Sequence, residues 1–154
     1  MPSKEVVELI RKGKAFFKRT KFKEALVHFE RAITLEPGYP ESWFLRGSVF
    51  ADTGRYKEGL ADCEKAISLE QNYADAWAKK GLILYHLERF EDALYASTRA
   101  ASLDGNNIMA WFIKGVSLDE LGRSDEAQEA YGRSLELEII ADMHAEQQRM
   151  RGQR

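Results

Sequence analysis

Apolar residues recur at intervals of three and four along most of the chain, which is the spacing of one face of an α-helix. Trp77, Gly81 and Leu84 mark one such face. Phe90 and Leu94 begin the next one after a short polar connector. No alternation typical of a β-strand competes with this pattern, so we expect an all-α chain of amphipathic helices joined in pairs.

The helical pattern itself repeats every 34 residues without an insertion. Glycine and alanine recur where two helices must approach closely, and tryptophan recurs where a large side chain can fill the space beside that contact. A helix pair of this size cannot bury its own apolar face, so neighbouring units must stack. We place four repeats at about 6–39, 40–73, 74–107 and 108–141. The recurring residues are Gly13, Gly47, Gly81 and Gly115, with Trp43, Trp77 and Trp111.

The segment from Trp111 to Leu118 reads W-x2-K-G-x2-L, and Tyr131 follows it. With the 34-residue period, this pattern resembles the tetratricopeptide repeat (TPR) family over about nine tenths of the chain. The resemblance implies a right-handed α-solenoid whose first helices line a concave groove that binds peptides or helices of other proteins, without catalysis. Cys63 and Ser97 stand where the family packs an aromatic ring.

The resemblance also implies which side chains face the groove, namely those at fixed positions of each repeat. These are mostly apolar and aromatic between charged margins, and an exposed surface of that kind is typical of partner binding. The alternative is that they pack against neighbouring helices. The expected lining is Ile10, Lys14, Phe17, Phe44, Leu45, Ser48, Lys79, Leu82, Tyr85, His86, Met109, Phe112, Ile113 and Val116.

Some family members hold the terminal carboxylates of chaperone tails with lysine, arginine and asparagine side chains. At the matching positions Lys14 and Lys79 keep a cation, but Ile10 and Leu45 offer no polar group. Asp75 would repel a carboxylate at close range. These residues argue against a chaperone-tail carboxylate clamp.

Charge is distributed unevenly, although the whole chain carries a formal net charge of only -2. Residues 1–39 contain 9 basic and 5 acidic side chains, whereas residues 108–141 contain 3 and 7. The basic cluster that includes Lys12 and Lys14 lacks a recognised nucleic-acid motif, so a solvated face is favoured over a nucleic-acid site. With 44% hydrophobic residues and no long apolar run, we expect no membrane insertion.

The residues that could carry chemistry are dispersed. The three histidines and the single Cys63 fall in different repeats without paired spacing, so we expect no metal and no cofactor. Neither a phosphate-binding glycine loop nor a nucleophile elbow is present, and the chain is not expected to be an enzyme. A lone cysteine and a charged amino-terminal segment favour the cytoplasm.

Two functions remain open at this point. The first is an adaptor or scaffold that binds an apolar peptide or an amphipathic helix in the concave groove. The second is a self-assembling structural module that forms homo-oligomers through its ends or its groove.

The carboxyl end departs from the repeat pattern because Ile139 stands where the earlier repeats have a break. From Ser124 we expect one long helix or a closely following cap, with residues 142–154 as a capping helix or polar tail. Ile139, Ile140 and Met143 would form an apolar strip, and we expect the last repeat, rather than a second chain, to cover it.

Overall fold

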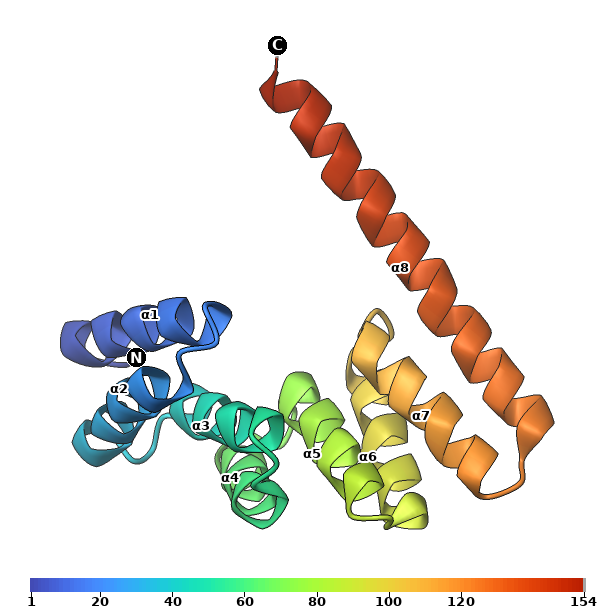
Figure 1. Cartoon of the computed structure of the whole chain (residues 1–154), viewed down its shortest axis with the longest axis horizontal. Coiled ribbons are helices and arrows are strands. Elements are labelled where there is room, and N and C mark those ends of the chain that lie inside the picture. The colour runs from blue at the N-terminus through green and yellow to red at the C-terminus, as the bar shows by residue number, and fades with distance from the viewer. Residues whose placement is uncertain (154) are drawn as a thin grey trace.

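The computed structural model describes residues 1–153 and shows a curved array of helices (Figure 1). Within these residues every regular element is an α-helix, and consecutive helices pack as hairpins. The expected all-α solenoid is confirmed. The helices are α1 (Lys4–Lys18), α2 (Phe22–Leu35), α3 (Pro40–Asp52), α4 (Tyr56–Leu69), α5 (Ala74–His86), α6 (Phe90–Leu103), α7 (Ile108–Glu120) and α8 (Ser124–Gly152).

The turn inside each hairpin has the same backbone geometry. One residue adopts a positive φ, and the next N–H bonds back to a carbonyl of the preceding helix, as Arg55 does to Phe50 at 2.8 Å. This arrangement satisfies a carbonyl that the helix end leaves free. A non-glycine residue in this conformation costs roughly 1 kcal/mol. The positive-φ residues are Thr20, Gly54, Glu88 and Gly122.

The recurring glycines lie where the second helix of a hairpin crosses the first. A Cβ added to Gly115 would lie 2.6 Å from the ring of Tyr131, and one added to Gly13 would overlap the ring of Phe29. In the two central hairpins Cys63 and Ser97 take the place of the ring. Whether a ring or a small side chain faces it, the residue of the first helix at the crossing must be glycine.

The recurring tryptophans tie each hairpin to the connector before it. The indole N–H of Trp77 donates to the carbonyl of Gln71 at 2.9 Å, and Trp43 and Trp111 make equivalent bonds. The Trp77 ring also packs against two buried clusters of side chains, one within its own hairpin and one that includes Ala100 of α6 and Ala110 of α7, across the boundary to the fourth repeat. One side chain therefore joins the start of a helix, its connector and the next repeat.

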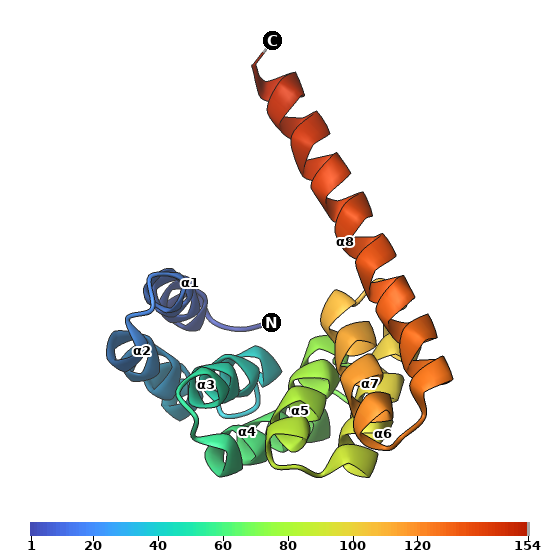
Figure 2. The ribbon, with the colours of Figure 1, turned by 45° about the vertical axis from the view of Figure 1, so that its right-hand side comes forward.

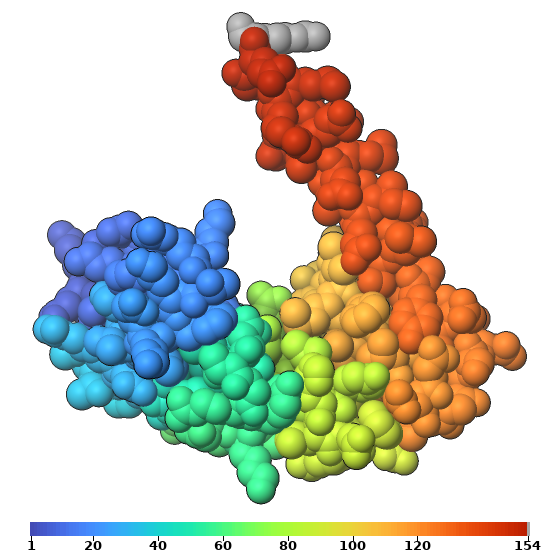
Figure 3. Space-filling view, in the orientation of Figure 1, coloured from blue at the N-terminus to red at the C-terminus, as the bar shows by residue number. Residues whose placement is uncertain are grey.

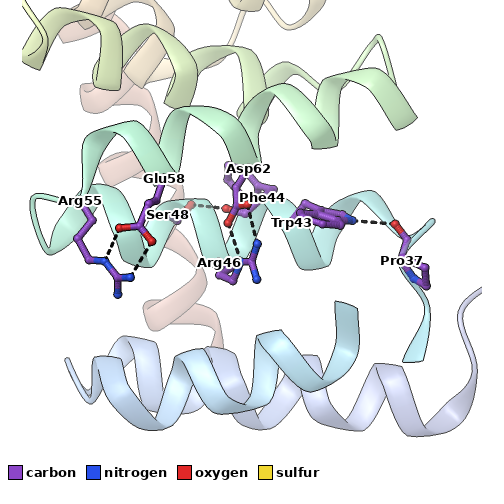
Figure 4. A network of polar contacts seen from close by, with 8 residues as sticks. All are labelled: Pro37, Trp43, Phe44, Arg46, Ser48, Arg55, Glu58 and Asp62. Atoms are coloured by element: carbon purple, nitrogen blue, oxygen red, sulfur yellow. Dashed lines mark hydrogen bonds and ion pairs between the residues drawn. The ribbon is translucent and has the colours of Figure 1, made fainter. Parts of the chain in front are cut away.

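A buried ion pair connects α3 with α4 (Figure 4). The Arg46 guanidinium donates to both oxygens of Asp62, at 2.8 and 2.9 Å, and Asp62 is only 4% exposed. The guanidinium carbon lies 5.1 Å from the Trp43 ring centre and 5.5 Å from that of Phe50. Its hydrogen bonds to Asp62, and the charge of that carboxylate, raise the pKa of Arg46. These contacts hold an otherwise costly charge between the two helices.

Helix α8 is longer than the others and runs straight away from the array (Figures 1 and 2). Its last buried residue is Leu137, and residues 142–152 continue the same helix rather than forming a separate cap. The expectation that the last repeat covers the apolar strip is wrong, because Ile139, Ile140 and Met143 are 53%, 41% and 56% exposed. The helix has 29 residues and its partner α7 only 13, so α8 extends beyond the end of its partner.

Replacing Trp77 by alanine should lower the free energy of unfolding by about 2 to 4 kcal/mol, because it removes a half-buried ring and its hydrogen bond. Chemical denaturation measures this loss. Tyr95→Ala is the control: Tyr95 lies beside the Trp77 ring but is 67% exposed, so its loss should stay below about 1 kcal/mol. Equal effects of the two changes would contradict the role given to Trp77.

Replacing Asp62 by alanine should lower the free energy of unfolding by about 1 to 3 kcal/mol, because the Arg46 guanidinium loses both acceptors. Adding Arg46→Met should recover much of that loss, since no unpaired charge then remains. Glu58→Ala, which breaks the exposed ion pair with Arg55, should leave stability nearly unchanged. Thermal unfolding of the three variants tests the interpretation, which fails if the double variant is the least stable.

Candidate functional site

The inner side of the curve is formed by α1, α3, α5 and α7, which we call the inner helices, and their inner faces form the groove (Figures 1 and 2). Figure 3 shows the surface hollowed between the amino-terminal hairpin and the α7–α8 hairpin. At its amino-terminal end the groove contains a depression of about 220 Å³, lined by Val7, Ile10, Arg11, Lys14, Tyr39 and Glu41.

Part of the expected lining is accessible to a ligand. Phe112 and Met109 on α7 are 49% and 37% exposed. Lys14 on α1 and His86, the last residue of α5, are also exposed. The half-buried members of the expected set are Phe17, Phe44, Lys79, Leu82, Tyr85 and Val116.

The other four expected residues lie inside the array. Ile10, Leu45 and Ile113 are 5%, 7% and 1% exposed, and Ser48 is 3% exposed with its hydroxyl donating to the Phe44 carbonyl. Neighbouring helices pack over their side chains. These residues support the groove from beneath and leave little surface for a ligand.

Aromatic partners outside the expected groove lining hold the groove's rings in place. The ring centres of Phe44 and Tyr73 are 5.1 Å apart, and those of Phe112 and Tyr131 are 6.2 Å apart. Tyr73 ends the second repeat as Tyr39 ends the first, so the 34-residue period was a signal for it. Burial, followed by nearby carboxylates, raises the pKa of Tyr73 above its usual range.

The side chains at the middle of the groove also pair with one another. His86 stacks on Tyr56 with ring centres 5.0 Å apart and planes 9° apart, and Tyr85 meets the edge of His86 at 5.8 Å. Phe17 packs against Phe22 at 6.0 Å, at the end of α1. His86 is therefore part of an aromatic cluster on the surface.

Polar groups link adjacent inner helices along the groove. Lys14 forms an ion pair with Glu41, which also accepts a hydrogen bond from the Tyr39 hydroxyl at 2.9 Å. Asp75 accepts one from the side chain of Asn107 at 2.8 Å. These carboxylates serve contacts between repeats.

The two ends of the groove differ in charge. Arg11 and Lys18 are exposed at the first repeat, whereas Asp119 and Glu120 are exposed at the fourth. Tyr131 donates to Asp119 at 2.8 Å, and burial together with this carboxylate raises the tyrosine pKa to about 12. A bound segment therefore meets a basic end and an acidic end.

The chain's single cysteine, Cys63, is buried in α4. Burial raises the pKa of Cys63 to about 12, so its thiol is protonated at neutral pH and shielded from reagents. Among residues 1–153, no group of three or more histidine, cysteine or acidic side chains is placed to hold a metal ion. None of the described helices combines the length and apolar character needed to cross a membrane.

Several solved structures share this arrangement. A crystal structure of MamA aligns with a TM-score of 0.77 at 23% identity, covering 90% of this chain and 81% of that one. The first TPR domain of Spaghetti (RPAP3), bound to the HSP90 peptide SRMEEVD, aligns at 0.69 and 22% identity, covering 86% and 97%. The Sgt2 TPR domain from Aspergillus fumigatus aligns at 0.76 and 19% identity, covering 81% and 84%. At these identities the likeness shows a common fold.

Comparison with curated proteins finds no match for this chain. Models of the tetratricopeptide repeat family, however, match residues 10–73 and 110–138, which together span the first two hairpins and most of the last. The hairpin geometry, the family models and the similar structures agree: the chain belongs to the tetratricopeptide repeat family and is a protein-interaction module.

Proposed function

We propose that the chain is an adaptor that binds an apolar peptide or an amphipathic helix of another protein in its groove. The observation that carries the proposal is the exposure of large apolar side chains on the inner faces of both end helices. Val7 on α1 is 50% exposed, and Met109 and Phe112 on α7 are 37% and 49% exposed. Apolar surface left in water on a concave face favours a partner with an apolar face.

The rings of the groove are well suited to act as anchors. Phe112 leans against Tyr131, which is itself held by Gly115 and Asp119, so little side-chain entropy is lost when a ligand packs on it. Anchors of this kind carry most of the binding energy at protein interfaces. The ligand should therefore present at least one large apolar side chain to α7.

The charge difference along the groove would set the direction of the ligand. Arg11 and Lys18 favour an acidic segment at the first repeat, and Asp119 and Glu120 favour a basic one at the fourth. These groups are exposed, so their contribution should weaken as salt rises.

The RPAP3 domain, with its bound HSP90 peptide, supports peptide binding by an array of this shape. The present groove differs in chemistry from a carboxylate clamp. Lys14 is paired with Glu41, and Leu45 is buried and offers no donor. We therefore propose a ligand recognised through its apolar face rather than through a terminal carboxylate.

Phe112→Glu should weaken binding of a groove ligand at least about tenfold, because it removes an anchor and places a charge in the contact. A displayed library of random helical peptides, selected on the native chain, supplies the ligand, and fluorescence anisotropy measures its affinity. Phe112 is a better site for this test than Phe44, whose half-buried ring packs on Tyr73.

The matched control is Tyr95→Glu, which places the same charge at an exposed aromatic residue of α6. It should leave the affinity unchanged. Circular dichroism must show that both variants keep their helices. If the selected peptides bind the two variants equally well, or if selection yields no binder, the groove is not the binding surface.

A further inference from the structure

The exposed part of α8 carries an apolar stripe whose side chains each leave more than half of their surface open to solvent. Leu135, Ile139, Met143 and Met150 are 58%, 53%, 56% and 60% exposed. Their spacing of four, four and seven residues places them on one face of the helix. The stripe begins just before Leu137, the last buried residue of α8, and continues along the segment that projects from the array in Figure 2.

Most of this stripe lies beyond the surface on which repeats stack. In the first three hairpins an aromatic residue and a leucine of the second helix pack toward the next repeat, as Tyr56 and Leu60 do in α4. The matching positions of α8 are Ser124 and Gln128, which are polar and exposed. Leu135 matches Ala101, which packs against the following repeat, but Ile139 and the rest of the stripe lie beyond the position at which the earlier second helices end. A further repeat stacked in the usual way would therefore cover only the beginning of the stripe.

The projecting segment also lacks the packing that normally maintains a helix. From residue 138 to residue 152 every side chain is exposed. An isolated helix of about 12 to 15 residues is marginally stable in water, and most helices depend on tertiary packing of an apolar face. A regular helix with an unpacked apolar stripe therefore indicates association through that stripe.

The charges beside the stripe specify a partner. Glu136, which also forms an ion pair with Arg133 of its own chain at 2.8 Å, lies near its beginning. The other charged side chains follow as acids up to the middle of the stripe and arginines at its end: Glu138, Asp142 and Glu146, then Arg149 and Arg151. An antiparallel pair of identical helices centred near Met143 would place Glu136 and Glu138 of each chain beside the arginines of the other. A parallel pair would place like charges together.

We propose that α8 pairs with α8 of a second copy of this chain, antiparallel, about a two-fold axis near Met143. Leu135 of one chain then faces Met150 of the other, and Met143 lies at the axis. Such a contact is isologous and closes as a dimer. The apolar stripe supplies the attraction, and the flanking charges fix the direction, as they do in paired helices generally.

This pairing would place the two helical arrays at opposite ends of the helix pair and leave both grooves open. A dimer could then engage two ligands, or two sites on one partner, with the gain that linked binding sites provide. The pairing does not depend on what the groove binds, because the stripe and the groove share no residue.

Sedimentation equilibrium of the whole chain, from low micromolar to several hundred micromolar, tests the pairing. The native chain should form a dimer, and Ile139→Glu combined with Met143→Glu should raise its dissociation constant at least about tenfold. His144→Glu combined with Gln148→Glu adds the same two charges on other faces of the helix and should leave the dimer intact. Phe112→Glu should also leave it intact.

A second set of variants tests the direction. Glu136→Arg with Glu138→Arg should weaken the dimer, and adding Arg149→Glu with Arg151→Glu should restore it, because the charges again complement each other. Failure of this restoration would overturn the antiparallel arrangement. A chain that is monomeric at every concentration, or a dimer lost through Phe112→Glu but not through the stripe variant, would overturn the proposal as a whole.

Discussion

The close approach of the two helices in each hairpin is the constraint on which the rest of the structure depends. Where they cross, the first helix carries a glycine. The residue of the second helix that fills the space beside this glycine differs between hairpins. Phe29 and Tyr131 lay a ring across the glycine, whereas Cys63 and Ser97 let the backbones approach. At Gly81 a Cβ would already lie 3.3 Å from the carbonyl oxygen of Ala93 and the amide nitrogen of Ser97. The way in which the two helices of a hairpin cross therefore depends on a glycine, which has no side chain to make contacts.

Stacking follows from that geometry, and the groove follows from stacking. Each tryptophan fixes the start of an inner helix to the preceding connector, so successive hairpins are added in the same orientation. Links such as Lys14 with Glu41 then fix the spacing between inner helices. The groove is a product of the repeats acting together, which is why its side chains can vary while its shape is retained.

The fold could be predicted from the sequence because its signals are periodic and local. Gly47, Gly81 and Trp77 recur at one spacing, and each repeat supplies the same local geometry. The groove could be predicted only in part, because equivalent positions of the repeat are not equally exposed. Ile10 and Phe112 share one position, yet they are 5% and 49% exposed. Repeat position fixes the direction of a side chain but not what lies beside it.

At the carboxyl end of the array, too, the sequence did not predict correctly what lies beside the apolar side chains. Ser124 and Gln128 replace the aromatic and the leucine that face the next repeat in the earlier hairpins, so this face of α8 is polar. The residues that follow contain no proline, so the backbone has no reason to turn back and the helix continues. The apolar strip lies on the part of the straight helix α8 that extends beyond the array, so the array cannot cover it. Hydrophobicity alone suggested burial against the last repeat, whereas helix length and direction leave that surface exposed.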